Sequence, residues 1–327
     1  MIIEYLVKKL SVNNDARIDK KHCIYYRNRF KRCVVCMEVC KYEAITSSED
    51  EIKIDNEKCK KCGLCKAQCP SQAVTIDNFG EIDLLKKSEK NCSLCVGCEK
   101  NLNSVDFSFK CLNGIHIEYL IAFLILNKDH EIAFKLNHCK DCDLNSSDNI
   151  EEKIKLSINF LKKLNINVKV KCIYEESPDC GKERLMTRRD FFNSIKGEST
   201  NIFKEFVVST LEEYYGKEDF NNRSFLLNVI SKLKKTFNED VDLEGNIFKN
   251  FKVKSNCDGC GLCEGICPYD AWKITETEES FKIEYNCSKC RGCRLCIDLC
   301  SNNSIEEEKV KLSYINNEYV EKLKKKK

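Results

Sequence analysis

The 327-residue sequence has little net charge, no long hydrophobic run and only four histidines. Its longest apolar stretch, Tyr119 to Leu126, is far shorter than the roughly 20 residues that a membrane-spanning helix requires, so we expect no membrane insertion. The formal net charge of +3 is spread evenly, which gives no reason to expect binding to nucleic acid. The N-terminal segment, with Glu4, Lys8 and Lys9, lacks the apolar core of a secretion signal, so we expect a reducing, cytoplasmic environment.

Sequence signatures of catalysis are also missing. The chain has no glycine-rich dinucleotide loop, no nucleotide-phosphate loop, and no set of serine, histidine and aspartate or pair of carboxylates attached to a motif. Its histidines form no metal-binding spacing: His22, His116, His130 and His138. We therefore predict no catalytic residue of these kinds.

Cysteine is what the sequence has in excess, with 25 residues of this type. The spacing C-x2-C-x2-C-x3-C followed by proline occurs twice: Cys59, Cys62, Cys65, Cys69 and Pro70; Cys257, Cys260, Cys263, Cys267 and Pro268. By this spacing a short loop and the start of a helix hold a 4Fe-4S cluster, and the fourth thiolate reaches a neighbouring cluster. A zinc ribbon needs only two C-x2-C pairs, so two complete runs predict iron-sulfur clusters and electron transfer, and they suggest an anaerobe.

A third, irregular run lies near the N-terminus. Cys33, Cys36 and Cys40 keep the last three positions of the spacing, while Phe30 stands where the first cysteine is expected. Cys23 is the obvious substitute, because a loop of a few extra residues adds little to the entropy of closure. The alternative is a lost or three-iron cluster with Cys23 as a spare buried thiol.

The C-terminal end has one thiol too many in its second run. Cys290, Cys293, Cys296 and Cys300 reproduce the full spacing, whereas a run that starts at Cys287 leaves Cys300 too far along to serve as the exchanged ligand. We take the first register and interpret Cys287 as spare. If the fourth ligand is exchanged between neighbours, four sets of ligands follow: Cys23, Cys33, Cys36 and Cys69; Cys40, Cys59, Cys62 and Cys65; Cys257, Cys260, Cys263 and Cys300; Cys267, Cys290, Cys293 and Cys296.

Both ends of the chain resemble the bacterial two-cluster ferredoxin on these motifs, over about residues 23–80 and 253–307. The resemblance implies a compact fold with internal two-fold symmetry and two 4Fe-4S clusters per module, about four in all. It also implies that single electrons pass at low potential to or from a partner, which would be a redox protein or an oxidoreductase complex.

The middle of the chain has a different pattern. Apolar periodicity predicts strands at 105–111, 131–136 and 167–173, and helices at 116–127 and 149–164, in the order βαβαβ. In such a parallel sheet, sites usually lie at the carboxyl ends of strands. Six cysteines could converge there as possible additional metal ligands: Cys92, Cys95, Cys98, Cys111, Cys139 and Cys142.

The segment from about Val105 to Glu175 resembles the delta subunit of methyl-viologen-reducing hydrogenase, through Cys111 with Gly114 and the cysteine pair after the second strand. That resemblance implies a 2Fe-2S cluster. Three interpretations stay open for the middle thiols, namely a further iron-sulfur centre, structural zinc, or a redox dithiol at Cys139 and Cys142. Cys172 and Cys180 have no close cysteine neighbours and are expected to be buried apolar side chains.

The predicted fold class is α+β, with two ferredoxin-like dicluster modules flanking a small α/β domain and a helical linker. The predicted domains are residues 1–85, 86–180, 181–250 and 251–327, the last with a hairpin at 271–283 and a solvated tail at Lys324 to Lys327. Two amphipathic helices are expected between Thr200 and Asp240.

Two functions follow. The first is a multi-cluster electron carrier whose two modules form two wires joined through the middle domain. The second is an iron-sulfur subunit of a redox enzyme complex, of hydrogenase or disulfide-reductase type, with catalytic or cluster-binding thiols in the middle domain. A zinc-bound scaffold is a third, simpler possibility.

Overall fold

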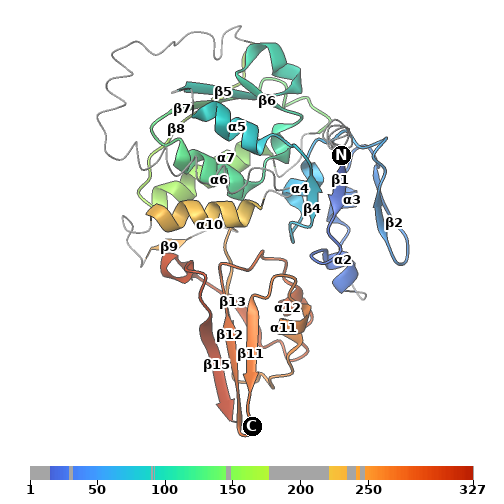
Figure 1. The fold of residues 1–327 in the computed structure, drawn as a ribbon, viewed down its shortest axis with the longest axis vertical. Helices are drawn as coiled ribbons and strands as arrows, with labels where there is room; N and C mark the ends of the chain where they lie inside the picture. The colour runs from blue at the N-terminus through green and yellow to red at the C-terminus, as the bar shows by residue number, and fades with distance from the viewer. Residues whose placement is uncertain are drawn as a thin grey trace, which may run out of the picture.

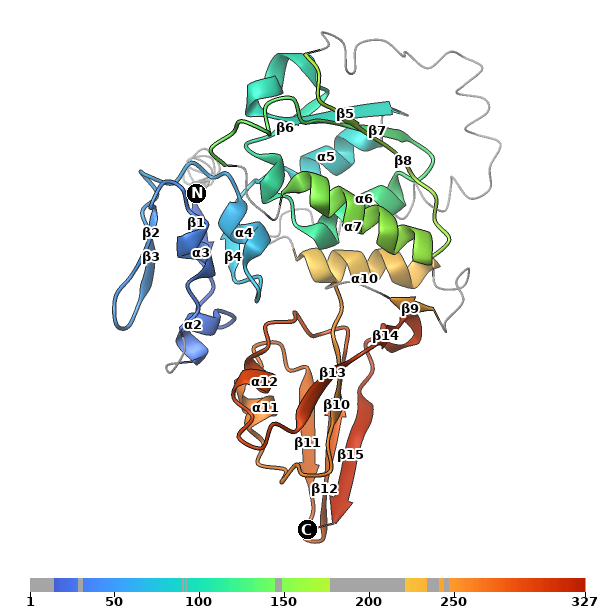
Figure 2. The same ribbon diagram turned by 180° about the vertical axis from the view of Figure 1, so that it is seen from behind.

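The computed structural model describes residues 15–28, 32–89, 91, 93–144, 149–176, 221–233, 241–243 and 247–326. Figure 1 shows an N-terminal module beside a central α/β domain, with a C-terminal module below them and helix α10 between the central domain and the C-terminal module. Figure 2 shows the same arrangement from behind. The predicted mixture of helices and strands is confirmed.

The N-terminal module is built from very short elements around two antiparallel strand pairs. β1 pairs with β4, and β2 pairs with β3. The elements are β1 (Ala16–Ile18), α2 (Ile24–Arg27), α3 (Val35–Glu38), β2 (Ile45–Ser47), β3 (Ile52–Ile54), α4 (Leu64–Gln68) and β4 (Val74–Ile76). Its own hydrophobic cluster is small and includes the thiols of Cys23, Cys36 and Cys65. A module with so little apolar burial depends on further links between its segments.

The central domain is a four-stranded parallel sheet in the order β6-β5-β7-β8. Its elements are α5 (Glu81–Ser88), β5 (Ser93–Cys98), η1 (Glu99–Ser104), β6 (Phe107–Phe109), η2 (Leu112–Gly114), α6 (Ile117–Leu126), β7 (Glu131–Lys135), α7 (Ile150–Lys163) and β8 (Lys169–Ile173). The predicted βαβαβ order from 105 to 173 is confirmed. The sequence interpretation missed β5, an inner strand of the sheet, because its cysteines were taken as part of a ligand run.

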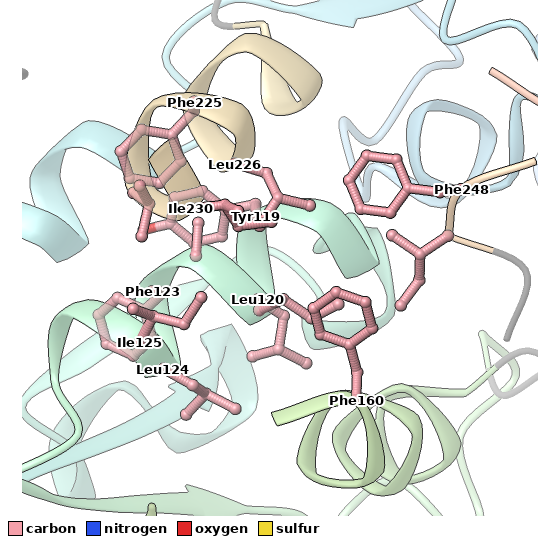
Figure 3. Close-up of a cluster of buried hydrophobic side chains, with 14 of the residues drawn as sticks. Tyr119, Leu120, Phe123, Leu124, Ile125, Phe160, Phe225, Leu226, Ile230 and Phe248 are labelled. Atoms are coloured by element: carbon pink, nitrogen blue, oxygen red, sulfur yellow. The ribbon is translucent and has the colours of Figure 1, made fainter. Parts of the chain in front are cut away.

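Helix α6 is the centre of the molecule, since its residues from Glu118 to Leu126 are all buried. A helix that is apolar on nearly every side belongs in a core rather than on a surface. It packs against α7 and against α10 (Asn222–Leu233), and the rings of Tyr119 and Phe225 stack across the contact with α10 (Figure 3). The second of the two expected helices is therefore confirmed as α10, and the first lies outside the described residues.

The C-terminal module repeats the plan of the N-terminal one and is larger. Its elements are β9 (Asp242–Leu243), β10 (Asn250–Val253), α11 (Leu262–Ile266), β11 (Trp272–Glu276), β12 (Ser280–Tyr285), α12 (Leu295–Asp298), β13 (Ile305–Glu308), β14 (Val310–Lys311), η4 (Leu312–Tyr314) and β15 (Val320–Lys326). β10 pairs with β13 as β1 pairs with β4, and the predicted hairpin is confirmed as β11 and β12. β9 pairs with β14.

The lysine-rich end of the chain is not a free tail. β15 pairs with β12, which places Leu323 opposite Ile283. The Lys322 amine donates to the side chains of Asn250 and Glu308, at 2.9 and 2.8 Å. The side chains of Lys324, Lys325 and Lys326 are exposed, as a solvated tail predicts, but their backbone forms an edge strand paired with Ser280 to Lys282 of β12. Lys327 lies outside the described residues.

Candidate iron-sulfur centres

The N-terminal module brings its predicted ligands into two groups of four. One group consists of Cys23, Cys33, Cys36 and Cys69. Burial and, after it, the neighbouring thiols raise the pKa of Cys23 to about 11 and the pKa of Cys36 to about 12. Cys40, Cys59, Cys62 and Cys65 form the other, in which burial and the other three thiols raise the pKa of Cys65. These are the two sets that exchange of the fourth cysteine predicts, with Cys69 in the first and Cys40 in the second.

Cys23 is the irregular member of this arrangement. It lies directly before α2 and its side chain is buried, with an exposed fraction of 8%. After burial, the neighbouring thiols of Cys69 and Cys33 raise its pKa. Cys23 therefore lies close enough to both to be the fourth ligand of that group. Phe30, which occupies the expected ligand position in the sequence, lies outside the described residues.

The cysteines of the C-terminal module are grouped in the same way. One group consists of Cys257, Cys260, Cys263 and Cys300. The other consists of Cys267, Cys290, Cys293 and Cys296. Cys287 is buried with an exposed fraction of 3% and lies near Cys290 and the guanidinium of Arg223. Its interpretation as spare stays a prediction.

The fourth cysteine of each of the four runs accepts the same kind of hydrogen bond. Its sulfur accepts a backbone N–H from the residue four positions on: Ala44 to Cys40 at 3.4 Å, Ala73 to Cys69 at 3.2 Å, Ala271 to Cys267 at 3.3 Å and Ser304 to Cys300 at 3.3 Å. The four runs are therefore locally equivalent, although Lys41 and Ser301 replace proline in two of them. Amide hydrogen bonds to sulfur stabilise a thiolate and tune the potential of a cluster.

In the central domain, four of the six thiols lie near one another after the carboxyl ends of the strands. Cys98 ends β5, Cys111 follows β6, and Cys139 and Cys142 follow β7. Burial, Cys98 and Cys142 raise the pKa of Cys139 to about 11, and burial with neighbouring thiols raises that of Cys111 to about 12.

Of the other two thiols, Cys95 does not join this group as a free ligand. Cys95 is disulfide-bonded and has an exposed fraction of 2%, and Cys92 lies outside the described residues. Because side chains alternate along a strand, Cys95 and Cys98 point to opposite faces of the sheet. Within the described ranges, no three His, Cys, Asp or Glu side chains are placed to hold a single metal ion.

The central thiols lie directly against the N-terminal module. An added Cβ on Gly114 would lie 2.3 Å from the Cys62 carbonyl oxygen and 2.8 Å from the Gly63 Cα, so the two backbones touch. Cys62 also raises the pKa of Cys111, after burial. The group at Cys98, Cys111, Cys139 and Cys142 therefore adjoins the group that contains Cys62.

A cavity of about 350 Å³ lies where the three parts of the molecule meet. Its lining includes Cys69, His116, Glu118 and Arg291. Glu118 Oε2 and Arg291 Nε are buried there, and neither has a hydrogen-bond partner among the described residues. Sequence reasoning expected no pocket and could not find this one, because its walls come from three distant segments.

Within the parts of the chain that the structure describes, no helix has the length and apolar character to cross a membrane. Comparison with protein families finds a 4Fe-4S dicluster domain at residues 256–304 and a 4Fe-4S binding domain at residues 52–75. These matches confirm ferredoxin-type 4Fe-4S domains near both ends of the chain and support multiple clusters.

Similar proteins include ferredoxins. A 7Fe ferredoxin of Hydrogenibacillus schlegelii is 41% identical over 44 residues, which cover 14% of this chain and 56% of that protein. Ferredoxin-1 of Caulobacter vibrioides is 33% identical over 48 residues, or 15% of this chain and 42% of the relative. An isethionate sulfite-lyase activating enzyme of Oleidesulfovibrio alaskensis is 47% identical over 45 residues, 13% of this chain and 15% of the enzyme. The chain thus spans about half or less of each relative.

Proposed function

We propose that this chain, which carries ferredoxin-type 4Fe-4S domains near both ends, is a multi-cluster electron-transfer protein that passes low-potential electrons to or from a partner oxidoreductase. The observation that carries the proposal is the grouping of sixteen predicted ligands into four sets of four, each with one thiol exchanged from a neighbouring run. That grouping supports two clusters per terminal module. We also propose the four-domain organisation of residues 1–85, 86–180, 181–250 and 251–327.

When bound, the clusters supply one-electron chemistry, and the residues of this chain hold and tune them. The thiols of Cys36, Cys263 and Cys293 each have a pKa raised to about 12, by burial first and then by neighbouring thiols. Cluster binding therefore releases protons from these groups, because the ligands are thiolates. The four repeated N–H bonds to the exchanged cysteines then offset part of the negative charge.

We further propose that Cys98, Cys111, Cys139 and Cys142 hold a fifth iron-sulfur centre. The ends of β5 and β6 and the loop after β7 place these four thiols together, and the backbone contact at Gly114 sets them against the loop of Cys62. Ligand sites in parallel sheets lie at such carboxyl ends. This centre would exchange electrons with the cluster of Cys40, Cys59, Cys62 and Cys65.

A second candidate function is a reducing subunit of an enzyme complex. The cavity beside Cys69 supports it, because its volume lies within the range of small-molecule sites. Glu118 and Arg291 in its lining each have one buried polar atom without a hydrogen-bond partner among the described residues. A dithiol at Cys139 and Cys142 is the alternative catalytic group. The variant Cys139→Ser discriminates: a dithiol enzyme loses disulfide reduction, whereas a carrier keeps electron transfer through its terminal clusters.

The proposal is tested by purifying the full chain anaerobically and counting iron, acid-labile sulfide and zinc, with electron paramagnetic resonance (EPR) spectra before and after dithionite. Four cubane clusters give about 16 irons, and a fifth centre raises the count to about 18 to 20. About 16 irons with one zinc make the central site structural, and zinc with little iron overturns the proposal.

The Cys23 assignment has a matched control. We expect Cys23→Ser to lose one cluster or convert it to a three-iron form, a loss of about one to four irons. Cys172→Ser, a substitution of a partly buried cysteine outside all groups, should lose none. An unchanged iron count in Cys23→Ser means that another residue completes the first cluster.

A further inference from the structure

We propose that the clusters form one continuous wire in which the two terminal modules are joined directly, through a junction centred on Tyr269. The proposal rests on the ligand sets of the proposed function. It replaces the expectation that the modules communicate through the central domain, because the structure places residues next to ligands of each module in contact with one another.

Tyr269 makes contacts with the N-terminal module on two sides. Its hydroxyl donates a hydrogen bond to the Ser71 carbonyl oxygen at 2.5 Å. Its ring stacks on the ring of His22, with centroids 4.5 Å apart and an interplanar angle of 18°. Tyr269 therefore bridges the two modules through both its hydroxyl and its ring.

Two arginines complete the junction, one from each module. The Arg291 guanidinium lies over the Tyr269 ring at 4.4 Å, within the range of a cation–π contact. From the other side, Arg27 Nη1 donates to the carbonyl oxygens of Gly265 and Ile266, at 3.5 and 3.4 Å. The junction is thus held by hydrogen bonds, stacking and charge together.

Each of these residues adjoins a ligand of one particular cluster. His22 precedes Cys23 and Ser71 follows Cys69 by two positions, and both of these cysteines belong to the first N-terminal set. Tyr269 follows Cys267 by two positions and Arg291 follows Cys290, and these cysteines belong to one C-terminal set. The junction therefore connects the cluster of Cys23, Cys33, Cys36 and Cys69 with the cluster of Cys267, Cys290, Cys293 and Cys296.

The remaining contacts place the other centres at the two ends of the wire. The Gly63 and Gly114 contact joins the central thiols to the second N-terminal cluster. At the far end Cys260 is exposed, so the cluster of Cys257, Cys260, Cys263 and Cys300 is open to a partner. Along this electron-transfer chain, the proposed iron-sulfur centre of the central domain comes first and is followed by the two N-terminal clusters. The Tyr269 junction then leads to the two C-terminal clusters.

The step across the junction is a single-electron exchange. One reduced cluster loses an electron and the facing oxidised cluster gains it, and no bond forms or breaks. The Tyr269 hydroxyl remains the hydrogen-bond donor to the Ser71 carbonyl oxygen, so no proton transfer accompanies the step. Because electron tunnelling falls exponentially with distance, a direct contact carries electrons faster than a detour through α6 and α10.

The test isolates the two clusters that face the junction. In the full chain, Cys59→Ser with Cys62→Ser and Cys257→Ser with Cys260→Ser remove the outer cluster of each module, which leaves about 8 irons in the terminal modules. Dithionite-reduced EPR spectra of this variant should show spin–spin interaction between the two remaining clusters. Two non-interacting signals at that iron content would overturn the wire, whereas a failure to retain iron would contradict the ligand sets of the proposed function.

A second measurement keeps every cluster ligand intact. The full chain is photoreduced by less than one electron per molecule, and freeze-quenched EPR follows the redistribution of that electron among the clusters. We expect Tyr269→Ala to lose the fast phase of redistribution at unchanged iron content. The matched control is Tyr319→Ala, since Tyr319 donates to the carbonyl of Asp270 in the same turn but stays within the C-terminal module. Equal rates in the two variants would overturn the role of Tyr269.

Discussion

Arg223, on α10, links the central domain to the C-terminal module. Its side chain and that of Glu118 have exposed fractions of 2% and 3%, and Nη2 lies 2.6 Å from the Glu118 Oε1 atom. The same guanidinium donates to the Ile247 carbonyl at 2.6 Å and lies 4.3 Å from the centroid of the Phe248 ring. Although burial opposes ionisation, Arg223 lowers the pKa of Glu118 to about 2.

We predict that Arg223→Ala destabilises the protein by about 3 to 5 kcal/mol, because it leaves a buried carboxylate without its partner. Chemical denaturation of the holoprotein under anaerobic conditions measures the change. Lys110→Ala is the control, since its pair with Glu99 is exposed and contributes at most about 1 kcal/mol.

The sign of the pH dependence follows from the lowered pKa of Glu118. The ion pair stabilises the folded state above the usual pKa of a glutamate, and this contribution is lost as the pH falls from there toward 2. Equal losses in Arg223→Ala and Lys110→Ala would show that the buried pair contributes no more than a surface pair.

At the scale of elements, the contact between η2 and the start of α4 determines how the central domain meets the N-terminal module. Gly63 has φ +82° and precedes α4, and Gly114 ends η2. A Cβ on Gly114 would approach the Cys62 carbonyl oxygen to 2.3 Å, and the clash is with backbone, which cannot rotate away. The two segments therefore require a residue without a side chain at this point.

We predict that Gly114→Ala costs about 1 to 3 kcal/mol and loosens the cluster of Cys40, Cys59, Cys62 and Cys65. Iron content, thermal unfolding and the EPR spectrum of the reduced protein measure the effect. Gly265→Ala serves as the control, because nothing lies within 4 Å of the added Cβ. A Gly114→Ala protein with wild-type stability and an unchanged spectrum would show that the two segments can separate without consequence.

At the scale of the whole molecule, the hydrophobic core is unevenly distributed. One large cluster runs through α6, α7 and α10 and continues into the C-terminal module at Phe251 and Trp272. The separate N-terminal cluster consists of eight buried residues, three of which are predicted cluster ligands. The N-terminal module therefore depends on its iron-sulfur clusters for stability more than the rest of the chain does.

We predict that removal of iron unfolds residues 15–76 while the central sheet and its helices remain folded. Metal ligation adds directly to the folding free energy of a small domain, whereas the buried helices need no such link. Hydrogen exchange of the anaerobic holoprotein and of the iron-free protein measures the difference segment by segment. Retained protection across residues 15–76 would contradict the prediction, and so would loss of protection throughout α6.

The sequence alone was sufficient wherever the controlling interactions are local. The cysteine spacing predicted clusters because three ligands of each set lie within a few residues, and the family matches at 52–75 and 256–304 confirm ferredoxin-type domains there. Alternation and helical periodicity likewise predicted β12, α6 and α10, because side-chain burial within one element follows its own period. The exchange of ligands between runs, and the assignment of Cys23, stay predictions.

Only the tertiary structure decided how these elements meet. Tyr269 and Ser71 are 198 positions apart, and Arg223 and Glu118 are 105 apart, so no local pattern contains their contacts. The same reason explains why β5 was missed and why β15 was taken for a tail, since strand pairing depends on a partner elsewhere in the chain. Spacing along the chain predicts which cysteines can share a cluster, and long-range packing decides which of these cysteine groups lie next to one another, because contacts between distant segments form only in the folded chain.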